Sequence, residues 1–154
     1  MHPVRRSPGP GAAGPPCRPP RTTPPESRRR SPAWRGNLAA IDELFAPDFV
    51  EHQPGIAPGR EGVKGSTRAL RAAFPDLRLA VEDAAAVGDR VWLRLRGTGT
   101  HDGLFMGLPG TGRPIDITVI DVVRVVDGRL VEHWGVADRF SVAQQIGLVP
   151  GGPR

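Results

Sequence analysis

The chain has 154 residues and a formal net charge of +5, but the charge is unevenly distributed. Residues 1–35 contain eight arginines and one acid, so this segment carries +7, whereas residues 36–154 carry −2. The high pI therefore does not indicate a basic folded domain. No run approaches the roughly 18 apolar residues that span a membrane. The lone Cys17 can form no intrachain disulfide, which excludes a disulfide scaffold.

Ten of the 18 prolines also lie in residues 1–35. A segment so rich in proline and arginine buries too little apolar surface to offset its ordering entropy, so we predict a disordered tail over residues 1–33. No aromatic residues alternate with its arginines, so we expect no specific nucleic-acid binding. No apolar signal-peptide core follows the arginines, and a cytoplasmic protein is expected. The prediction is one domain over residues 34–150 and a flexible C-terminus at 151–154.

The first part of this domain has helical periodicity. Asn37 is a suitable N-cap, and Pro47 is expected to end the first helix. A short strand is predicted over residues 49–53, and a second amphipathic helix over residues 61–74. The apolar residues of the first helix are Leu38, Ile41, Leu44 and Phe45.

After Pro75 the apolar period changes from 3.6 to 2, which predicts strands. Asp127-Gly128 suits the positive φ angles of a two-residue type I′ turn, so a final hairpin is expected around it. Helices followed by an antiparallel sheet indicate an α+β fold. The predicted segments are strands at 77–82, 91–96, 115–126 and 129–138, a glycine-rich connection at 97–113, and a short helix at 141–146.

Asp121 is the first candidate for a functional residue. It alternates with Ile117, Val119, Val123 and Val125, and the other members of this set are all apolar. A carboxylate on a buried face must be paired, or its pKa rises. Asp121 is therefore either a hydrogen-bonded core aspartate or an acid or base in a pocket.

The partner of Asp121 depends on the register of the hairpin. A strict two-residue turn places Asp121 opposite Trp134, and a three-residue turn with a glycine bulge places it opposite His133. The second register would form a carboxylate–imidazole pair that can transfer protons near neutral pH. The sequence leaves both registers open.

Three further residues are candidates for binding a small molecule. His52 stands where a strand enters a proline loop, and it either lines the pocket mouth or is merely exposed. Trp92 and Trp134 form either an aromatic wall for a flat ligand or part of a packed sheet face. His101 is expected in a loop.

We predict no metal site, because the histidines lack HExxH spacing and no CxxC occurs. The GxGxxG motif of dinucleotide-binding loops is absent from residues 34–150, and the GxSxG motif of serine nucleophiles is absent from the sequence.

Four phrases together carry a family resemblance: GNLAAIDELFAPDFVEHQP, LRAAFPDLRLAVED, GDRVWLRLRGTGTHDGLFMGLPGTGR and VDGRLVEHWGVAD. From Trp34 to Pro150 the chain resembles the SnoaL-like polyketide (ester) cyclases of the NTF2-like superfamily. The resemblance implies an α+β cone, in which N-terminal helices and a curved antiparallel sheet surround an apolar pocket, and a homodimer formed through the sheet. It also implies an intramolecular aldol cyclisation without metal or cofactor, catalysed by an aspartate.

The chain departs from the family at two places. The aspartate that the family uses on its last strand falls on Gly135, Asp138 matches a second acid three residues later, and a family histidine falls on Asp121. The acid/base has therefore either moved to Asp121, with His133 beside it, or catalysis has been lost. The long first helix of the family is also replaced by the Pro/Arg-rich segment, and only Trp34-Arg35-Gly36-Asn37 of its end remains.

Two functions follow from the sequence patterns and the family resemblance. The first is a cofactor-independent cyclase of secondary metabolism that acts on a small cyclic or polyketide-like carbonyl compound, with Asp121, His133 and Asp138 as catalytic candidates. The second is a non-catalytic module that binds a small apolar molecule. In both, His52, Trp92 and Trp134 are the candidates for contact with the ligand.

Overall fold

The fold is taken from a computed structural model that describes residues 37–150. The predicted tail at 1–33 and C-terminus at 151–154 lie outside the described residues, as do residues 34–36 of the predicted domain. Among the described residues, no helix is long and apolar enough to cross a membrane.

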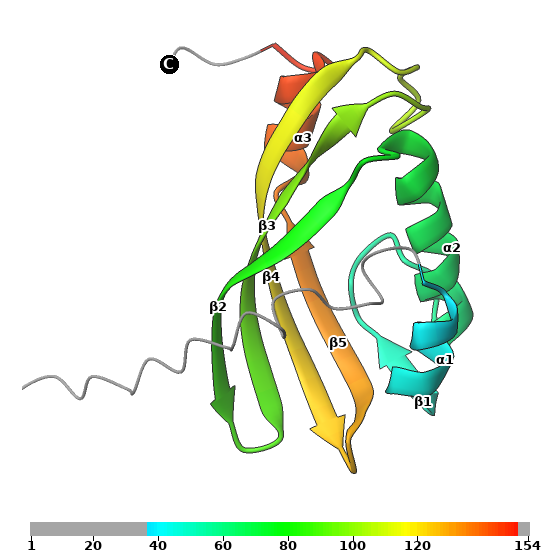
Figure 1. The fold of residues 1–154 in the computed structure, drawn as a ribbon, viewed down its shortest axis with the longest axis vertical. Helices are drawn as coiled ribbons and strands as arrows, with labels where there is room; N and C mark the ends of the chain where they lie inside the picture. The colour runs from blue at the N-terminus through cyan, green and yellow to red at the C-terminus, as the bar shows by residue number, and fades with distance from the viewer. Residues whose placement is uncertain (1–36, 151–154) are drawn as a thin grey trace, which may run out of the picture.

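Residues 37–150 form three helices and five strands, and the α+β class predicted from the sequence is confirmed. The strands make one curved, open sheet in the order β1-β5-β4-β3-β2. In Figure 1 the long strands β2 to β5 lie side by side with a strong twist, and α2 runs along one side near α1 and β1. The elements are α1 (Ala39–Leu44), β1 (Phe45–Glu51), α2 (Gly59–Ala73), β2 (Arg78–Val87), β3 (Arg90–His101), β4 (Arg113–Val126), β5 (Arg129–Ala137) and α3 (Arg139–Ile146).

The sheet is not wholly antiparallel, because β1 pairs with β5 in parallel. β1 begins at Phe45, directly after α1, so Pro47 lies within a strand instead of ending the helix. Proline is tolerated there because β1 is an edge strand, where a missing backbone donor costs little. Asn37 does not cap α1 either: the N-cap position is Leu38, and no side chain of residues 37–150 caps this helix.

The predicted connection over residues 97–113 is too long. β3 continues to His101 and pairs with β4 residue by residue up to Arg113. Gly97 and Gly99 belong to the strand, where a Cβ on Gly97 would lie 3.1 Å from Leu79 Cδ2. Glycine allows this close approach within the sheet. The glycines that predicted a loop are therefore explained by packing between strands. His101 is consequently a fully buried strand residue and not a loop residue.

The two faces of the sheet differ in what covers them. The inner face carries the buried side chains of Leu95, Val119 and Asp121, and the outer face carries exposed apolar residues such as Ile120 and Val136. Alternation along a strand separates these two sets. One core cluster joins α2, α3 and β4 on the inner side, and it comprises Ala73, Phe74, Ile115, Val142 and Ile146.

Candidate functional site

The β4–β5 hairpin determines which residues share the inner face. Asp127 and Gly128 have φ angles of 49° and 76°, which confirms the predicted two-residue turn. Val126 pairs with Arg129, but the register then shifts by one residue between Arg124 and Val125. Asp121 therefore lies opposite Gly135, so neither predicted register is right. Val131 is the bulge residue that causes this shift, and the turn sequence alone does not predict it.

Three ionisable side chains nevertheless form a row on the inner face, across three neighbouring strands. Glu51 of β1 pairs in register with His133 of β5, and Asp121 of β4 is the diagonal neighbour of His133. His133 Nδ1 lies 2.9 Å from both carboxylate oxygens of Glu51, and Nε2 lies 3.4 Å from Asp121 Oδ1. The structure thus joins the two residues that the sequence singled out, Asp121 and His133, and adds Glu51.

This row is almost entirely removed from solvent. The side chains of Glu51, Asp121 and His133 are 1%, 3% and 10% exposed. Burial alone disfavours the imidazolium, but hydrogen bonding and the charges of Asp121 and Glu51 outweigh it and raise the pKa of His133 to about 9. His133 is therefore a cation at neutral pH. Its Nδ1–H donates to Glu51, and its Nε2–H has no hydrogen bond of good geometry among residues 37–150.

Gly135 leaves a space in this row that another side chain enters. A Cβ at Gly135 would lie 2.2 Å from Gln53 Oε1, 2.8 Å from His133 Cε1 and 3.0 Å from Asp121 Oδ1. Three polar side chains thus converge on one point beside a residue that has no side chain. The backbone N–H of Gln53 donates to Glu51 Oε1 at 2.8 Å, which holds the segment after β1 against the row.

His52 and Trp134 lie on the outer face, away from Asp121 and His133. Their rings stack at 4.5 Å with an interplanar angle of 7°, and His52 Nε2 lies 3.1 Å from Glu132 Oε2. Arg90 covers the Trp134 ring at 5.6 Å. These contacts connect the edge strand β1 to β5, so the structure does not bring these two predicted ligand contacts together with the inner row.

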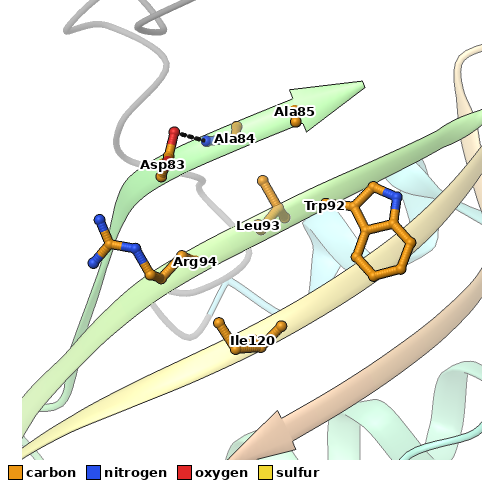
Figure 2. Close-up of a pocket in the computed structure, with 7 residues that line it drawn as sticks. All are labelled: Asp83, Ala84, Ala85, Trp92, Leu93, Arg94 and Ile120. Carbon is orange, nitrogen blue, oxygen red and sulfur yellow. Dashed lines mark hydrogen bonds between the residues drawn. The ribbon is translucent and has the colours of Figure 1, made fainter. Parts of the chain in front are cut away.

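Trp92 also lies on the outer face and is 50% exposed. It borders a shallow open depression with a volume of about 180 Å³, shown in Figure 2. None of the inner row lines this depression. Its lining residues are Asp83, Ala84, Ala85, Trp92, Leu93, Arg94 and Ile120.

Asp138, the third catalytic candidate, caps a helix in the structure. It is the N-cap of α3, and its carboxylate accepts hydrogen bonds from Ser141 N at 2.9 Å and from Ser141 Oγ at 2.6 Å. These bonds hold the pKa of the carboxyl below its usual value. No contact joins Asp138 to the inner row within the described part of the chain.

Residues 37–150 contain no group of three or more His, Cys, Asp or Glu side chains arranged to hold a metal ion. In the inner row the imidazolium lies between two carboxylates and takes the place that a cation would need. The ring nitrogens of His133 and the carboxylates of Glu51 and Asp121 are therefore engaged with one another.

Glu51 and Gln53 were missed by the sequence reasoning. The signal was present in the phrase FVEHQP, because Phe49, Glu51 and Gln53 alternate in the same way as the set around Asp121. Phe49 is buried, so the side chain of Glu51 two residues later points to the same side of β1.

Comparison with known proteins identifies the family. The sequence profile of the SnoaL-like polyketide cyclases matches residues 29–146. The chain belongs to this family. It is 28% identical over 109 residues to the aklanonic acid methyl ester cyclase DauD of Streptomyces sp. strain C5, and the match covers 70% of this chain and 66% of DauD. The chain thus spans just under two thirds of that relative.

Solved structures agree on the fold. IdmH of Streptomyces antibioticus, described as a candidate polyketide cyclase, is 42% identical with a TM-score of 0.67, over 75% of this chain and 91% of IdmH. AclR of Streptomyces galilaeus, described as a candidate hydroxylase, is 33% identical with a TM-score of 0.71, over 79% of this chain and 78% of AclR. Because the fold carries both descriptions, the reaction must be argued from the side chains of the site.

Proposed function

We propose that the protein is a cyclase that closes a ring in a polyketide-type carbonyl compound by acid/base catalysis without a cofactor. The observation that carries the proposal is the buried row of Glu51, His133 and Asp121. It combines an ionised imidazole with two carboxylates on one face of the sheet, and this is the chemistry that enolate formation requires. Membership of the SnoaL-like polyketide cyclases supports the same reaction class.

Each residue of the row has a definable task in this proposal. Asp121 removes a proton from the carbon beside a carbonyl group. The Nε2–H of His133, which has no good hydrogen-bond partner in residues 37–150, donates to the oxygen on which negative charge develops. Glu51 accepts from Nδ1 and keeps the imidazole charged and oriented. Preorganised donors of this kind act most strongly where water is excluded.

Ring closure then follows within the same molecule. The electron pair of the enolate carbon forms a bond to a second carbonyl carbon, and the π electrons of that carbonyl move to its oxygen. The proton held by Asp121 returns to the new alkoxide. The product is an isomer of the substrate, so no oxidant or reductant is needed.

Aklanonic acid methyl ester is the first probe, because DauD is named as a cyclase of this compound. The full-length protein is incubated with it in D₂O, and deuterium incorporation and ring closure are followed by mass spectrometry and chromatography. A panel of other polyketide-type carbonyl compounds tests the class beyond this ester. We expect Asp121→Asn to lower proton abstraction by about 10²- to 10⁴-fold, the usual effect of losing one positioned base.

Asp116→Asn is the matched control, because Asp116 lies on the same strand but faces outward and pairs with Arg96. It should retain full activity. Unchanged turnover by Asp121→Asn would refute the assignment of the base. Binding of a probe without deuterium incorporation in the wild type would favour the non-catalytic module.

A further inference from the structure

Gln53 is a polar side chain beside the inner row that has no part in the acid/base steps above. It lies two residues beyond Glu51, is half-buried, and directs its amide to the space beside Gly135. Within residues 37–150 this amide forms no hydrogen bond, whereas the backbone N–H of the same residue is bonded to Glu51. The amide is therefore free to bind a group on a ligand.

Because residue 135 is a glycine, the Gln53 amide can approach Asp121 and His133. The point where a Cβ of residue 135 would stand lies within 3.0 Å of Gln53 Oε1, His133 Cε1 and Asp121 Oδ1 alike. Any side chain at this position would have to displace the Gln53 amide. The carboxylate of Asp121, the ring of His133 and the amide of Gln53 therefore converge on one point beside Gly135, as functional groups around reacting atoms do.

We infer that Gln53 is a third substrate-contacting residue, whose amide N–H binds the oxygen of the carbonyl group that accepts the new carbon–carbon bond. An amide carries two N–H donors and one acceptor, and rotation of its last bond selects which faces the substrate. His133 and Gln53 then stabilise different oxygens: His133 the enolate oxygen in the first step, and Gln53 the alkoxide oxygen that forms in the second.

This inference rests on the proposed function and divides it into two measurable steps. Proton abstraction needs Asp121 and His133, whereas ring closure also needs Gln53. Gln53→Met keeps the length of the side chain but removes its donors and acceptor. In D₂O the variant should abstract the proton at a rate within about threefold of the wild type, while ring closure falls by about 10²-fold, as on loss of one oxyanion donor. Recovered substrate should accumulate deuterium.

Gln144→Met is the matched control, because Gln144 is another half-buried glutamine that lies on α3 outside the inner row. It should leave both rates unchanged, and thermal melts should show that both variants are folded. Equal loss of proton abstraction and ring closure in Gln53→Met would overturn the inference, as would loss of neither. Failure of the proposed function is a separate result: Asp121→Asn would then leave deuterium incorporation intact, or the wild type would incorporate none.

A second variant checks the position of the amide by electrostatics. Gln53→Glu has the same shape but adds a carboxylate beside Asp121. Repulsion between the two carboxylates should move the acidic limb of the kcat/KM profile for proton abstraction to higher pH. An unchanged profile would show that residue 53 does not lie beside Asp121 and would contradict the inference.

Discussion

The charge state of His133 leads to a prediction about stability as well as catalysis. Its pKa of about 9 in the native protein compares with 6.5 for an ordinary histidine. Below pH 6.5 the imidazole is protonated in both the native and the unfolded chain, so the stabilisation is complete. Between pH 6.5 and 9 only the native protein holds this proton. The free energy of unfolding should therefore fall as pH rises through this window.

The size of the effect follows from the same two values. A pKa difference from 6.5 to about 9 corresponds to about 3 kcal/mol, at roughly 1.4 kcal/mol for each pH unit. Glu51 and Asp121 are buried on either side of the imidazolium, so loss of its proton leaves two buried carboxylates without a counter-charge.

Urea unfolding of the full-length protein between pH 6 and 10 measures the change. Subtraction of the same series for His133→Gln removes the contributions of other groups that titrate in this range. An NMR titration of the His133 ring in the wild type gives its pKa directly and does not depend on the variant folding. A ring that titrates near pH 6.5, with a flat stability difference, would refute the charge assignment of the inner row.

Two further predictions concern residues outside the inner row. Asp138→Ala should destabilise the protein by about 1 kcal/mol, because the N-cap of α3 is lost. Deuterium incorporation should stay unchanged. A large loss of activity would instead show that Asp138 takes part in catalysis. We also expect the outer face to pair two copies of the chain, because Trp92, Ile120 and Val136 leave it apolar and exposed. Light scattering should show a dimer that Val136→Asp dissociates. Leu104→Asp, at an equally exposed site in the loop between β3 and β4, is the control, and a wild-type monomer would refute the expectation.

Local patterns predicted most of the architecture. The change of period after Pro75 located the strands, and Asp127-Gly128 located the last turn, because both depend on residues adjacent in the sequence. The parallel pairing of β1 with β5 joins residues about 80 positions apart, so no local pattern encodes it. Glu51 was missed for this reason: its partner, His133, becomes its neighbour only when the edge strand is added to the sheet.

The ligand contacts were harder to predict, because one residue of register decides which face a side chain occupies. Strict pairing from the turn would place Trp134 beside Asp121. The bulge at Val131 places Trp134 on the outer face instead, where it stacks on His52. The sequence left His133 and Trp134 open as partners of Asp121, and neither predicted register is right. His133 is still a neighbour of Asp121, because diagonal residues on adjacent strands also face each other.

The register also bears on Gly135, where the family resemblance places the catalytic acid. Asp121 and Gly135 are directly opposite each other on β4 and β5. The Cβ atoms of directly opposite residues are about 5 Å apart, so an acid on either strand reaches nearly the same volume. Asp121 Oδ1 lies 3.0 Å from the point where a Cβ of residue 135 would stand. An aspartate at 121 with glycine at 135 therefore places a carboxylate beside the position of a side chain at 135, and the glycine provides the room for Gln53. For this reason the glycine does not by itself indicate lost catalysis.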